Sequence, residues 1–157
     1  METMTISSSD SPAGSAEDDY APSPAEWVRQ QVAAIEAAGD TNAVDLNGLP
    51  VMVLTMRGAK SGKIRKVPLM RVEHDGVYLA VASKGGAPSD PQWYLNLKAD
   101  PDIVVQDGTV KHDVRARELE GAEREQWWER AVAAFAPYAE YQQKTSRTIP
   151  VLLLEPR

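Results

Sequence analysis

Residues 51–83 decide the fold, and they read VMVLTMRGAKSGKIRKVPLMRVEHDGVYLAVAS. An apolar run over 51–57 is followed by two strand-like segments, 64–73 and 77–83, which flank Asp75-Gly76. An Asp-Gly pair between two such segments is a strong signal for a two-residue hairpin turn. The stretch therefore predicts three antiparallel strands.

Outward from this stretch the sequence predicts three more strands and four helices. Upstream, a helix starts at Pro24 and ends at Gly39, with Ser23 and Glu26 forming a capping box. Downstream we expect helices over 93–99, 121–135 and 138–144 and strands over 103–106, 109–119 and 149–154, with a second hairpin turn at Asp107-Gly108. Strands and long helices do not alternate along the chain. We therefore expect an α+β fold, mainly β with α, in which about six mostly antiparallel strands form a sheet or barrel with surrounding helices.

Residues 1–22 have the composition of a disordered acidic tail, whereas the rest reads as one domain. The tail is rich in Ser, Ala, Pro, Asp and Glu and nearly lacks large apolar side chains. It cannot bury enough surface to offset the entropy lost on ordering. The chain has 157 residues, the length of one ordinary domain, and we assign residues 23–157 to that domain.

The net charge of −6 says little about binding partners, because five of the acids lie in residues 1–24, which contain no Lys or Arg. The remainder is nearly neutral. No apolar run approaches the roughly 20 residues that a membrane-spanning helix needs, and the first residues lack the pattern of a secretory signal. The absence of cysteine excludes disulfides, thiolate nucleophiles and sulfur-based zinc sites. We therefore expect a cytoplasmic protein.

Residues 54–72 are strongly basic and contain no acid. The cations are Arg57, Lys60, Lys63, Arg65, Lys66 and Arg71. Lys60-Ser61-Gly62-Lys63 falls in the turn between two predicted strands, where backbone amides, a hydroxyl and ammonium groups can converge on a phosphate or carboxylate. We expect an anion-binding site in this turn. The alternative is that some of the cations form an ordinary solvated edge that prevents strand association.

Two other segments are candidates for a binding pocket. Ser83-Lys84-Gly85-Gly86-Ala87-Pro88 follows a strand directly and leads toward Trp93-Tyr94, and its glycines would let a flat ring approach the backbone closely. The alternative is a plain connecting loop beside core aromatic residues. Tyr138 and Tyr141 lie on similar sides of a predicted helix, so their hydroxyls either line a pocket or pack in the core.

Metal, nucleic-acid and P-loop sites are not indicated by the sequence. The only histidines, His74 and His112, have no convincing ligand partner. The positive segment is confined to one hairpin, which disfavours nucleic acid as a partner. Gly58 to Lys63 is one residue short of a P-loop, and Ile64 stands where Ser or Thr would hold magnesium.

Motifs that occur in order over residues 25–156 resemble those of the deazaflavin (F420)-dependent nitroreductase family. The matching residues are Leu54-Thr55, Gly58, Lys60-Ser61-Gly62, Arg65, Pro68, Val81 to Pro88, Trp93 to Leu97, Asp100-Pro101, Tyr138 to Gln142 and Thr145 to Pro150. The whole ordered set is more specific than any one motif. The resemblance implies a split β-barrel related to flavin reductases, with reduced coenzyme F420, or F420H2, as the hydride donor.

The resemblance also implies roles for individual residues. It assigns the coenzyme's phosphate and acidic tail to Lys60, Ser61, Gly62, Lys63 and Arg65, and the deazaflavin to Ala82, Ser83, Lys84, Gln92, Trp93, Tyr94 and Asn96. It places Ser83, Tyr138 and Tyr141 against the substrate, where they would stabilise negative charge or help to supply a proton. We therefore expect an F420H2-dependent oxidoreductase that passes hydride to a quinone, a nitroaromatic or an activated alkene.

Some residues depart from the family pattern, and the sequence leaves two rival functions open. Ala59, Met70 and Phe135 replace an arginine and two tyrosines of some members, which weakens the expectation of nitroimidazole reduction more than that of coenzyme binding. An FMN-dependent oxidoreductase on the same barrel, or a non-enzymatic carrier of F420, would also use the basic residues.

The N-terminal region of related proteins can contribute to membrane association, so peripheral membrane contact is one expectation for this chain. We expect residues 1–22 to be dispensable for folding and for coenzyme binding.

Overall fold

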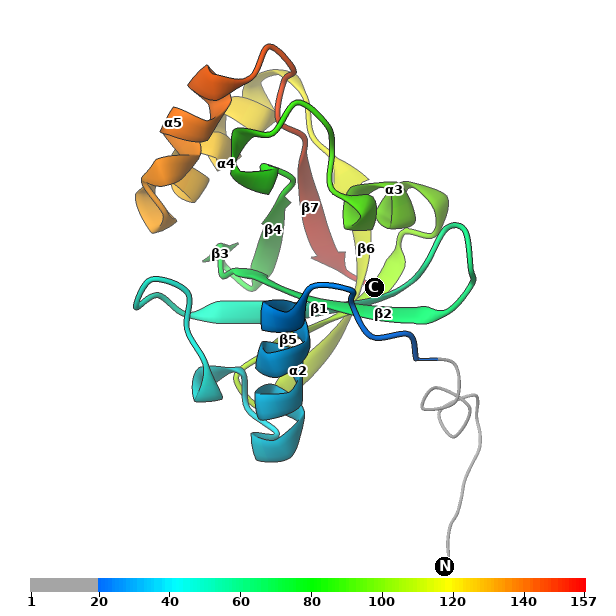
Figure 1. Cartoon of the computed structure of the whole chain (residues 1–157). Helices are drawn as coiled ribbons and strands as arrows, with labels where there is room; N and C mark the ends of the chain where they lie inside the picture. Colours follow the sequence, from blue (N-terminus) through cyan, green and yellow to red (C-terminus); the bar gives the residue numbers. More distant parts are fainter. Residues whose placement is uncertain (1–19) are drawn as a thin grey trace, which may run out of the picture.

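The structure is a computed structural model that describes residues 20–157 (Figure 1). The expected tail over residues 1–22 lies outside the described residues except for its last three. Tyr20 forms an isolated parallel bridge with Ile64, and the N–H of Ala21 donates to the carbonyl of Ile64 at 2.9 Å. The described part of the chain therefore starts alongside a strand of the sheet.

Within residues 20–157 the chain forms one seven-stranded sheet in which all neighbouring strands are antiparallel. The strands are β1 (Val51–Arg57), β2 (Ile64–Met70), β3 (Glu73–His74), β4 (Val77–Val81), β5 (Asp102–Asp107), β6 (Val110–Glu118) and β7 (Val151–Pro156), in the order β2-β1-β5-β6-β7-β4-β3. The two edge strands, β2 and β3, are joined by Arg71 and Val72 alone. The sheet therefore curls on itself (Figure 1), and the expected α+β split barrel is confirmed.

The strand expected over residues 64–73 is broken at Arg71 and Val72. The N–H of Arg71 donates to the carbonyl of Pro50, at the start of β1, at 3.1 Å, whereas the carbonyl of Val72 accepts from the N–H of Leu79 in β4 at 3.0 Å. Consecutive residues therefore bond to opposite ends of the sheet. The break adds one strand to the expected number and separates β2 from β4, which the hairpin pattern predicts as neighbours.

Both predicted hairpin turns form, and one of them is shifted by a residue. Asp75 and Gly76 have positive φ angles of 53° and 81°, as the two-residue turn between β3 and β4 requires. In the second hairpin Asp107 still belongs to β5, so the turn residues are Gly108, with φ of 62°, and Thr109. A glycine with positive φ at the first turn position is typical of such turns.

Within the described residues four α-helices surround the sheet: α2 (Glu26–Ala38), α3 (Gln92–Ala99), α4 (Gly121–Ala134) and α5 (Pro137–Lys144); two short 3-10 helices are η1 (Thr41–Ala43) and η2 (Lys84–Gly86). α2 packs on β1, where Ile35 joins Val51 and Val53 in a small apolar cluster. α4 and α5 lie together beside β4 and β7 at one end of the molecule (Figure 1). None of these helices is both long enough and apolar enough to cross a membrane.

The capping box predicted at the start of α2 is wrong, whereas the predicted stop is confirmed. α2 begins at Glu26, and its N-cap, Ala25, has extended backbone and no side-chain hydrogen bond. The Ser23 hydroxyl instead accepts from the N–H of Ala25 at 3.1 Å, before the helix starts. Gly39 ends the helix in the left-handed conformation with φ of 68°, and its N–H donates to the carbonyl of Ile35 at 2.7 Å.

β7 is buried on both faces, and it joins the barrel core to the layer formed by α4 and α5. Val151 and Leu153 pack in the cluster that contains side chains of both helices, whereas Leu152 and Leu154 pack inside the barrel. Successive strand side chains point to opposite faces, so a strand covered on both sides needs a continuous apolar run. This arrangement holds α5 in place over the end of the sheet.

Candidate active site

Three neighbouring cavities share lining residues, and we refer to them together as the groove. We call them the aromatic cavity, of about 420 Å³, the middle cavity, of about 270 Å³, and the basic cavity, of about 180 Å³. Val67 and Trp93 line both the aromatic and the middle cavity, and Arg65, Gln92 and Asn96 line both the middle and the basic cavity. The groove therefore leads from aromatic side chains at one end to cationic side chains at the other.

The lining of the groove comes from segments that are far apart in the sequence. The aromatic cavity is lined by Trp27, Leu46, Asn47, Val67, Pro68, Leu69, Met70, Val81, Ser83, Lys84, Gly85, Pro91, Trp93, Phe135, Tyr138 and Tyr141. The middle cavity is lined by Ser23, Pro24, Val28, Met56, Arg65, Lys66, Val67, Gln92, Trp93 and Asn96, and the basic cavity by Gly58, Ala59, Lys60, Ser61, Arg65, Gln92 and Asn96.

The turn between β1 and β2 forms the basic end of the groove. The N–H of Gly58 donates to the carbonyl of Lys63 at 2.7 Å, and the N–H of Gly62 donates to the carbonyl of Gly58 at 2.9 Å. The backbone N–H groups of Lys60 and Ser61 have no acceptor among residues 20–157, and neither lysine of the turn has an ion-pair partner there. The turn therefore offers free amides and free ammonium groups to an anion.

Asn96 fixes this turn against helix α3. The Asn96 side-chain oxygen accepts from the N–H of Ala59 at 2.9 Å and from the Gln92 side-chain amide at 3.2 Å. Asn96 is itself buried. The Arg65 guanidinium, which lines the adjoining part of the groove, donates to the carbonyl oxygens of Ala21 and Pro22 at 3.1 Å and 3.0 Å.

Two of the basic residues of segment 54–72 hold the fold together instead. The Lys66 ammonium lies 3.0 Å from a carboxylate oxygen of Glu36 in α2, and the Arg71 guanidinium donates to Asp107 in β5 at 2.8 Å. These two cations are neither an anion site nor a bare solvated edge. An anion site in the Lys60 to Arg65 part of the segment stays a prediction.

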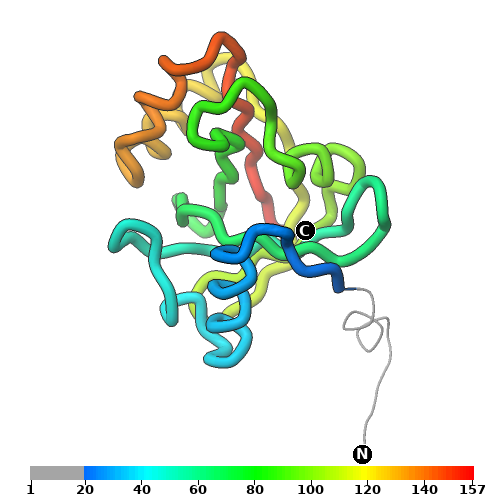
Figure 2. Tube along the Cα trace, viewed as in Figure 1, coloured from blue at the N-terminus to red at the C-terminus, as the bar shows by residue number. Residues whose placement is uncertain are grey.

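The glycine-rich segment after β4 packs directly on α5. Gly86 has φ of 83°, and a Cβ atom at this position would lie 2.8 Å from the carbonyl oxygen of Tyr141 and 3.1 Å from Cβ of Lys144. Only glycine fits both the backbone conformation and the space. This close approach places Ser83 and Gly85 on one wall of the aromatic cavity and Tyr141 on another; Figure 2 shows the two segments side by side.

Three aromatic rings from the α4–α5 region meet at the aromatic cavity. The ring centroids of Phe135 and Tyr138 lie 5.0 Å apart, and those of Tyr138 and Tyr141 lie 6.3 Å apart. Burial, and to a smaller extent the neighbouring Tyr141, raise the pKa of Tyr138 above its ordinary value. The Tyr138 phenol therefore keeps its proton at neutral pH and can act as a hydrogen-bond donor.

Ser83 presents a hydroxyl that no group in the described part of the chain uses. Ser83 is only 8% exposed, it lines the aromatic cavity, and its hydroxyl has no hydrogen-bond partner within residues 20–157. The Ser83 carbonyl, in contrast, accepts from the N–H of Gly86 at 2.9 Å and from the Arg147 guanidinium at 2.8 Å. The backbone is held while the hydroxyl stays available to a ligand.

The structure brings most of the expected site residues to the groove. Lys60, Ser61, Arg65, Ser83, Lys84, Gln92, Trp93, Asn96, Tyr138 and Tyr141 line one or more of the three cavities. Gly62, Lys63 and Ala82 do not line them. Gly62 shapes the basic turn with φ of 72°, while Ala82 is fully buried behind the aromatic cavity.

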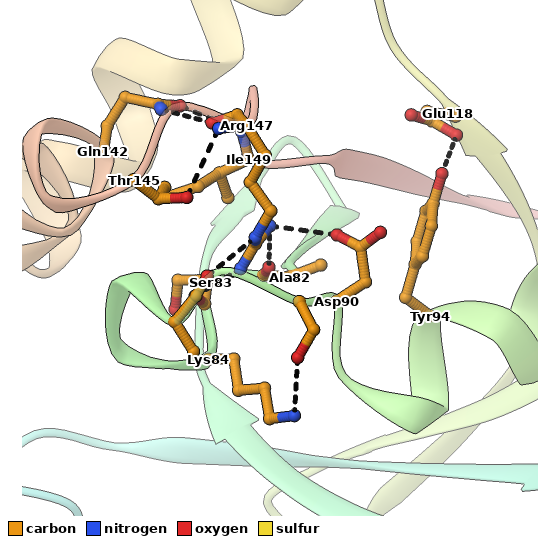
Figure 3. A network of polar contacts seen from close by, with 12 residues as sticks. Ala82, Ser83, Lys84, Asp90, Tyr94, Glu118, Gln142, Thr145, Arg147 and Ile149 are labelled. Carbon is orange, nitrogen blue, oxygen red and sulfur yellow. Dashed lines mark hydrogen bonds and ion pairs between the residues drawn. The ribbon is translucent and has the colours of Figure 1, made fainter.

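Tyr94 points to a different partner. Its hydroxyl donates to Glu118 at 2.7 Å (Figure 3), and burial together with this hydrogen bond raises its pKa. Tyr94 lines none of the three cavities, whereas Trp93 lines two. Neighbouring residues of a helix point about 100° apart, so the groove receives only one of this aromatic pair. A coenzyme contact of Tyr94 stays a prediction.

Arg147 is a site residue that the sequence reasoning did not include. Its guanidinium contacts the segment between β4 and α3, as Figure 3 shows, and so holds one wall of the aromatic cavity from behind. An arginine in a polar loop is typical of a solvated surface. The sequence signal for Arg147 is its place within the family motif Thr145 to Pro150, which does not show what the guanidinium contacts.

A family model described as F420H2-dependent quinone reductase matches residues 27–156. The chain belongs to this family. An F420H2-dependent quinone reductase of Mycobacterium tuberculosis is 37% identical over 111 residues, which cover 69% of this chain and 74% of that protein. The deazaflavin-dependent resemblance stated from the sequence motifs is thus confirmed.

Two solved structures are also similar to this chain. One, an F420-H2-dependent reductase, is 57% identical and covers 71% of this chain and 99% of its own, with a TM-score of 0.65. The other, described as a domain-swapped dimer, is 55% identical and covers 85% of this chain and 100% of its own, with a TM-score of 0.67.

Proposed function

We propose that this chain binds F420H2 in the groove and delivers its hydride to a quinone in the aromatic cavity. The observation that carries the proposal is that these three neighbouring cavities extend from the tyrosines of α5 to Lys60 in the β1–β2 turn. A coenzyme with a flat ring at one end and anionic groups at the other matches this distribution of apolar and basic side chains.

The basic cavity and the β1–β2 turn that forms part of its wall suit the anionic part of the coenzyme. Lys60 and Lys63 have no acid partner in the described chain, and the amides of Lys60 and Ser61 lack acceptors. Free backbone amides and ammonium groups at one turn are the donors that phosphates and carboxylates require. Asn96 holds the turn in this conformation through the N–H of Ala59.

The residues of the aromatic cavity suit a flat ring and an electron-poor substrate. Trp93 offers an apolar face, and the backbone of Gly85 offers a surface without a side chain. The coenzyme, when bound, supplies the hydride. Ser83, Tyr138 and Tyr141 then act as donors to a quinone oxygen as negative charge develops on it, which is where fixed donors lower an activation barrier.

We expect quinones to be better substrates than nitroimidazoles. Phe135 and Met70 line the aromatic cavity without a hydroxyl group, so they cannot donate to a nitro group. Nitroaromatics and activated alkenes are proposed as secondary substrates. We also propose a cytoplasmic protein that contacts membranes peripherally through its N-terminal region.

A binding titration with F420 and with FMN tests the coenzyme assignment. We expect F420 to bind more tightly than FMN, because the basic turn offers more positive charge than one phosphate needs. The quinone assignment is tested by anaerobic steady-state oxidation of F420H2 with menadione as acceptor. Equal affinity for both coenzymes would contradict the first assignment, and coenzyme binding without menadione reduction would mean that the chain is a carrier.

A further inference from the structure

One guanidinium holds the segment that follows β4. Arg147 donates to the carbonyl oxygens of Ala82 at 3.2 Å, Ser83 at 2.8 Å and Ala87 at 2.9 Å, and to the carboxylate of Asp90 at 2.9 Å (Figure 3). The side chain is 15% exposed, so most of it is shielded from water. Charge-assisted hydrogen bonds in such surroundings are stronger and more directional than those at an open surface.

The backbone of Arg147 is held in turn by helix α5. The Gln142 side-chain amide donates to the carbonyl of Arg147 at 2.8 Å, and the Gln142 side-chain oxygen accepts from the N–H of Ile149 at 2.9 Å (Figure 3). The N–H of Arg147 donates to the Thr145 hydroxyl at 3.3 Å. Arg147 therefore joins two elements that are remote in the sequence, the segment after β4 and helix α5.

Each of these two elements contributes lining residues to the aromatic cavity. Ser83 comes from the segment after β4, and Tyr138 and Tyr141 come from α5, while Arg147 itself lines none of the three cavities. We infer that Arg147 is a positioning residue, which sets the Ser83 hydroxyl relative to the two tyrosines. This inference rests on the proposed function, because the distance between these groups matters only if one substrate contacts them together.

Lysine cannot reproduce this arrangement. The guanidinium carries five N–H donors in a rigid plane, and it uses three of its nitrogens on acceptors that lie in different directions. An ammonium group keeps the charge but not the planar fork. Replacing Arg147 with lysine therefore separates the positioning role from the charge, and it leaves the contacts from Gln142 to the backbone unchanged.

The test compares Arg147→Lys with Arg117→Lys, a matched control. Arg117 lies on β6 outside the groove, and its guanidinium also makes several charge-assisted bonds, to Glu123 and Glu155. For Arg147→Lys we expect kcat with F420H2 and menadione to fall by about tenfold to a hundredfold, because a shift of about 1 Å in a reacting geometry can cost a hundredfold. The dissociation constant for F420 should change less than threefold, since the basic turn is untouched. Arg117→Lys should keep the wild-type kcat.

Two further measurements separate positioning from general destabilisation. In Arg147→Ala, added guanidinium at low millimolar concentration should restore part of kcat, while ammonium should not. Hydrogen exchange should be faster in Arg147→Lys at the amides of Gly86 and Ala87, which donate to Ser83 and Lys84, but unchanged in β4.

Wild-type kcat in fully folded Arg147→Lys, or a loss of kcat that only follows the unfolded fraction and is not rescued by guanidinium, would overturn the inference. If the wild-type protein does not oxidise F420H2 with any quinone, the proposed function fails instead. Faster exchange at Gly86 and Ala87 would then still establish the structural clamp, and unchanged exchange would disprove it.

Discussion

Gly86 lies so close to the backbone of Tyr141 that a Cβ atom at position 86 would be 2.8 Å from the Tyr141 carbonyl oxygen. Backbone atoms cannot move aside as the tip of a flexible side chain can. The contact holds the segment after β4 against α5, at the point where both line the aromatic cavity. The packing of one glycine therefore bears on the shape of the proposed substrate pocket.

Gly86→Ala should destabilise the protein by about 2–4 kcal/mol, combining a cost of about 1–2 kcal/mol for the left-handed backbone with overpacking. It should also lower kcat, because the added methyl group pushes Tyr141 away from Ser83. Denaturant unfolding and menadione turnover measure the two effects. Gly85→Ala is the matched control for stability, since Gly85 has φ of 64° but nothing within 4 Å of its Cβ position. Equal destabilisation by the two substitutions would show that the contact with Tyr141 does not matter.

Lys60→Ala and Lys63→Ala should each weaken F420 binding by about tenfold at low ionic strength, because each removes an ammonium group that faces no acid in residues 20–157. The loss should shrink in about 1 M salt, where charges are screened within about 3 Å. Fluorescence titration of F420 at two salt concentrations measures both effects. Lys111→Ala is the control: this lysine is exposed on β6 and does not belong to the β1–β2 turn, so its removal should leave the affinity unchanged.

Tyr138→Phe, Tyr141→Phe and Ser83→Ala should lower kcat more than they weaken F420 binding, since the lost donors act mainly on charge that develops in the transition state. We expect about a hundredfold for the buried Tyr138 and less for the more exposed Tyr141. Because burial raises the pKa of Tyr138, the wild-type rate should show no loss from its ionisation between neutral and mildly alkaline pH. Wild-type turnover in all three variants would mean that these residues only shape the pocket.

The ion pair between Arg71 and Asp107 should make stability depend on acid pH. Burial alone would raise the pKa of Asp107, but the hydrogen bonds from Arg71 and Tyr78 outweigh burial and lower it below its ordinary value. A lowered pKa in the folded state adds stability that is complete above the unfolded pKa of about 3.9 and is lost as pH falls below it. Asp107→Asn should therefore destabilise the protein at pH 7 by about 1–3 kcal/mol.

The difference between wild type and Asp107→Asn should shrink as urea unfolding is repeated down to about pH 3. The exposed Asp113 of β6 provides the control substitution, Asp113→Asn, for which we expect little change at either pH. Burial, together with the hydrogen bond to Asp107, raises the pKa of Tyr78 to about 12. A constant difference across this pH range would contradict the assigned role of the Asp107 carboxylate.

Removal of the N-terminal residues should have two distinct effects. A chain that starts at Tyr20 should bind F420 as the full chain does. A chain that starts at Ser23 lacks Ala21 and Pro22, whose carbonyl oxygens accept from Arg65. It should therefore bind more weakly, by a few-fold, because Arg65 lines the middle and basic cavities. Equal affinity of the two shortened chains would support the expectation that all of residues 1–22 are dispensable.

The sequence predicts local structure well, because the signals for turns and stops act locally. Asp75-Gly76 and Gly39 adopt the positive φ angles that their positions require. The strand order does not follow from such signals, since β1 pairs with β5, and β7 with β4 and β6, across long stretches of chain. The break at Arg71 and Val72 is visible only in the structure, where these two consecutive residues bond to opposite ends of the sheet.

For the candidate site, motif and charge predict which segments meet, but not which side chains face the groove. The sequence assigns Trp93 and Tyr94 alike to the coenzyme. Only Trp93 lines the cavities, because the Tyr94 hydroxyl donates to Glu118. Lys60 and Lys66 both belong to the basic segment, yet Lys66 pairs with Glu36. Arg147 lies within the family motif Thr145 to Pro150, but its role does not follow from the sequence, because its acceptors lie far upstream in the chain.

The most direct test of the central claim is an anaerobic reaction of purified protein with F420H2 and menadione, followed through the absorbance of the oxidised deazaflavin. We expect F420H2 to be oxidised at a rate proportional to protein concentration and only when menadione is present. We expect no comparable oxidation of reduced FMN. A protein that leaves F420H2 unoxidised, or that oxidises reduced FMN at the same rate, would contradict F420H2-dependent quinone reduction by this chain.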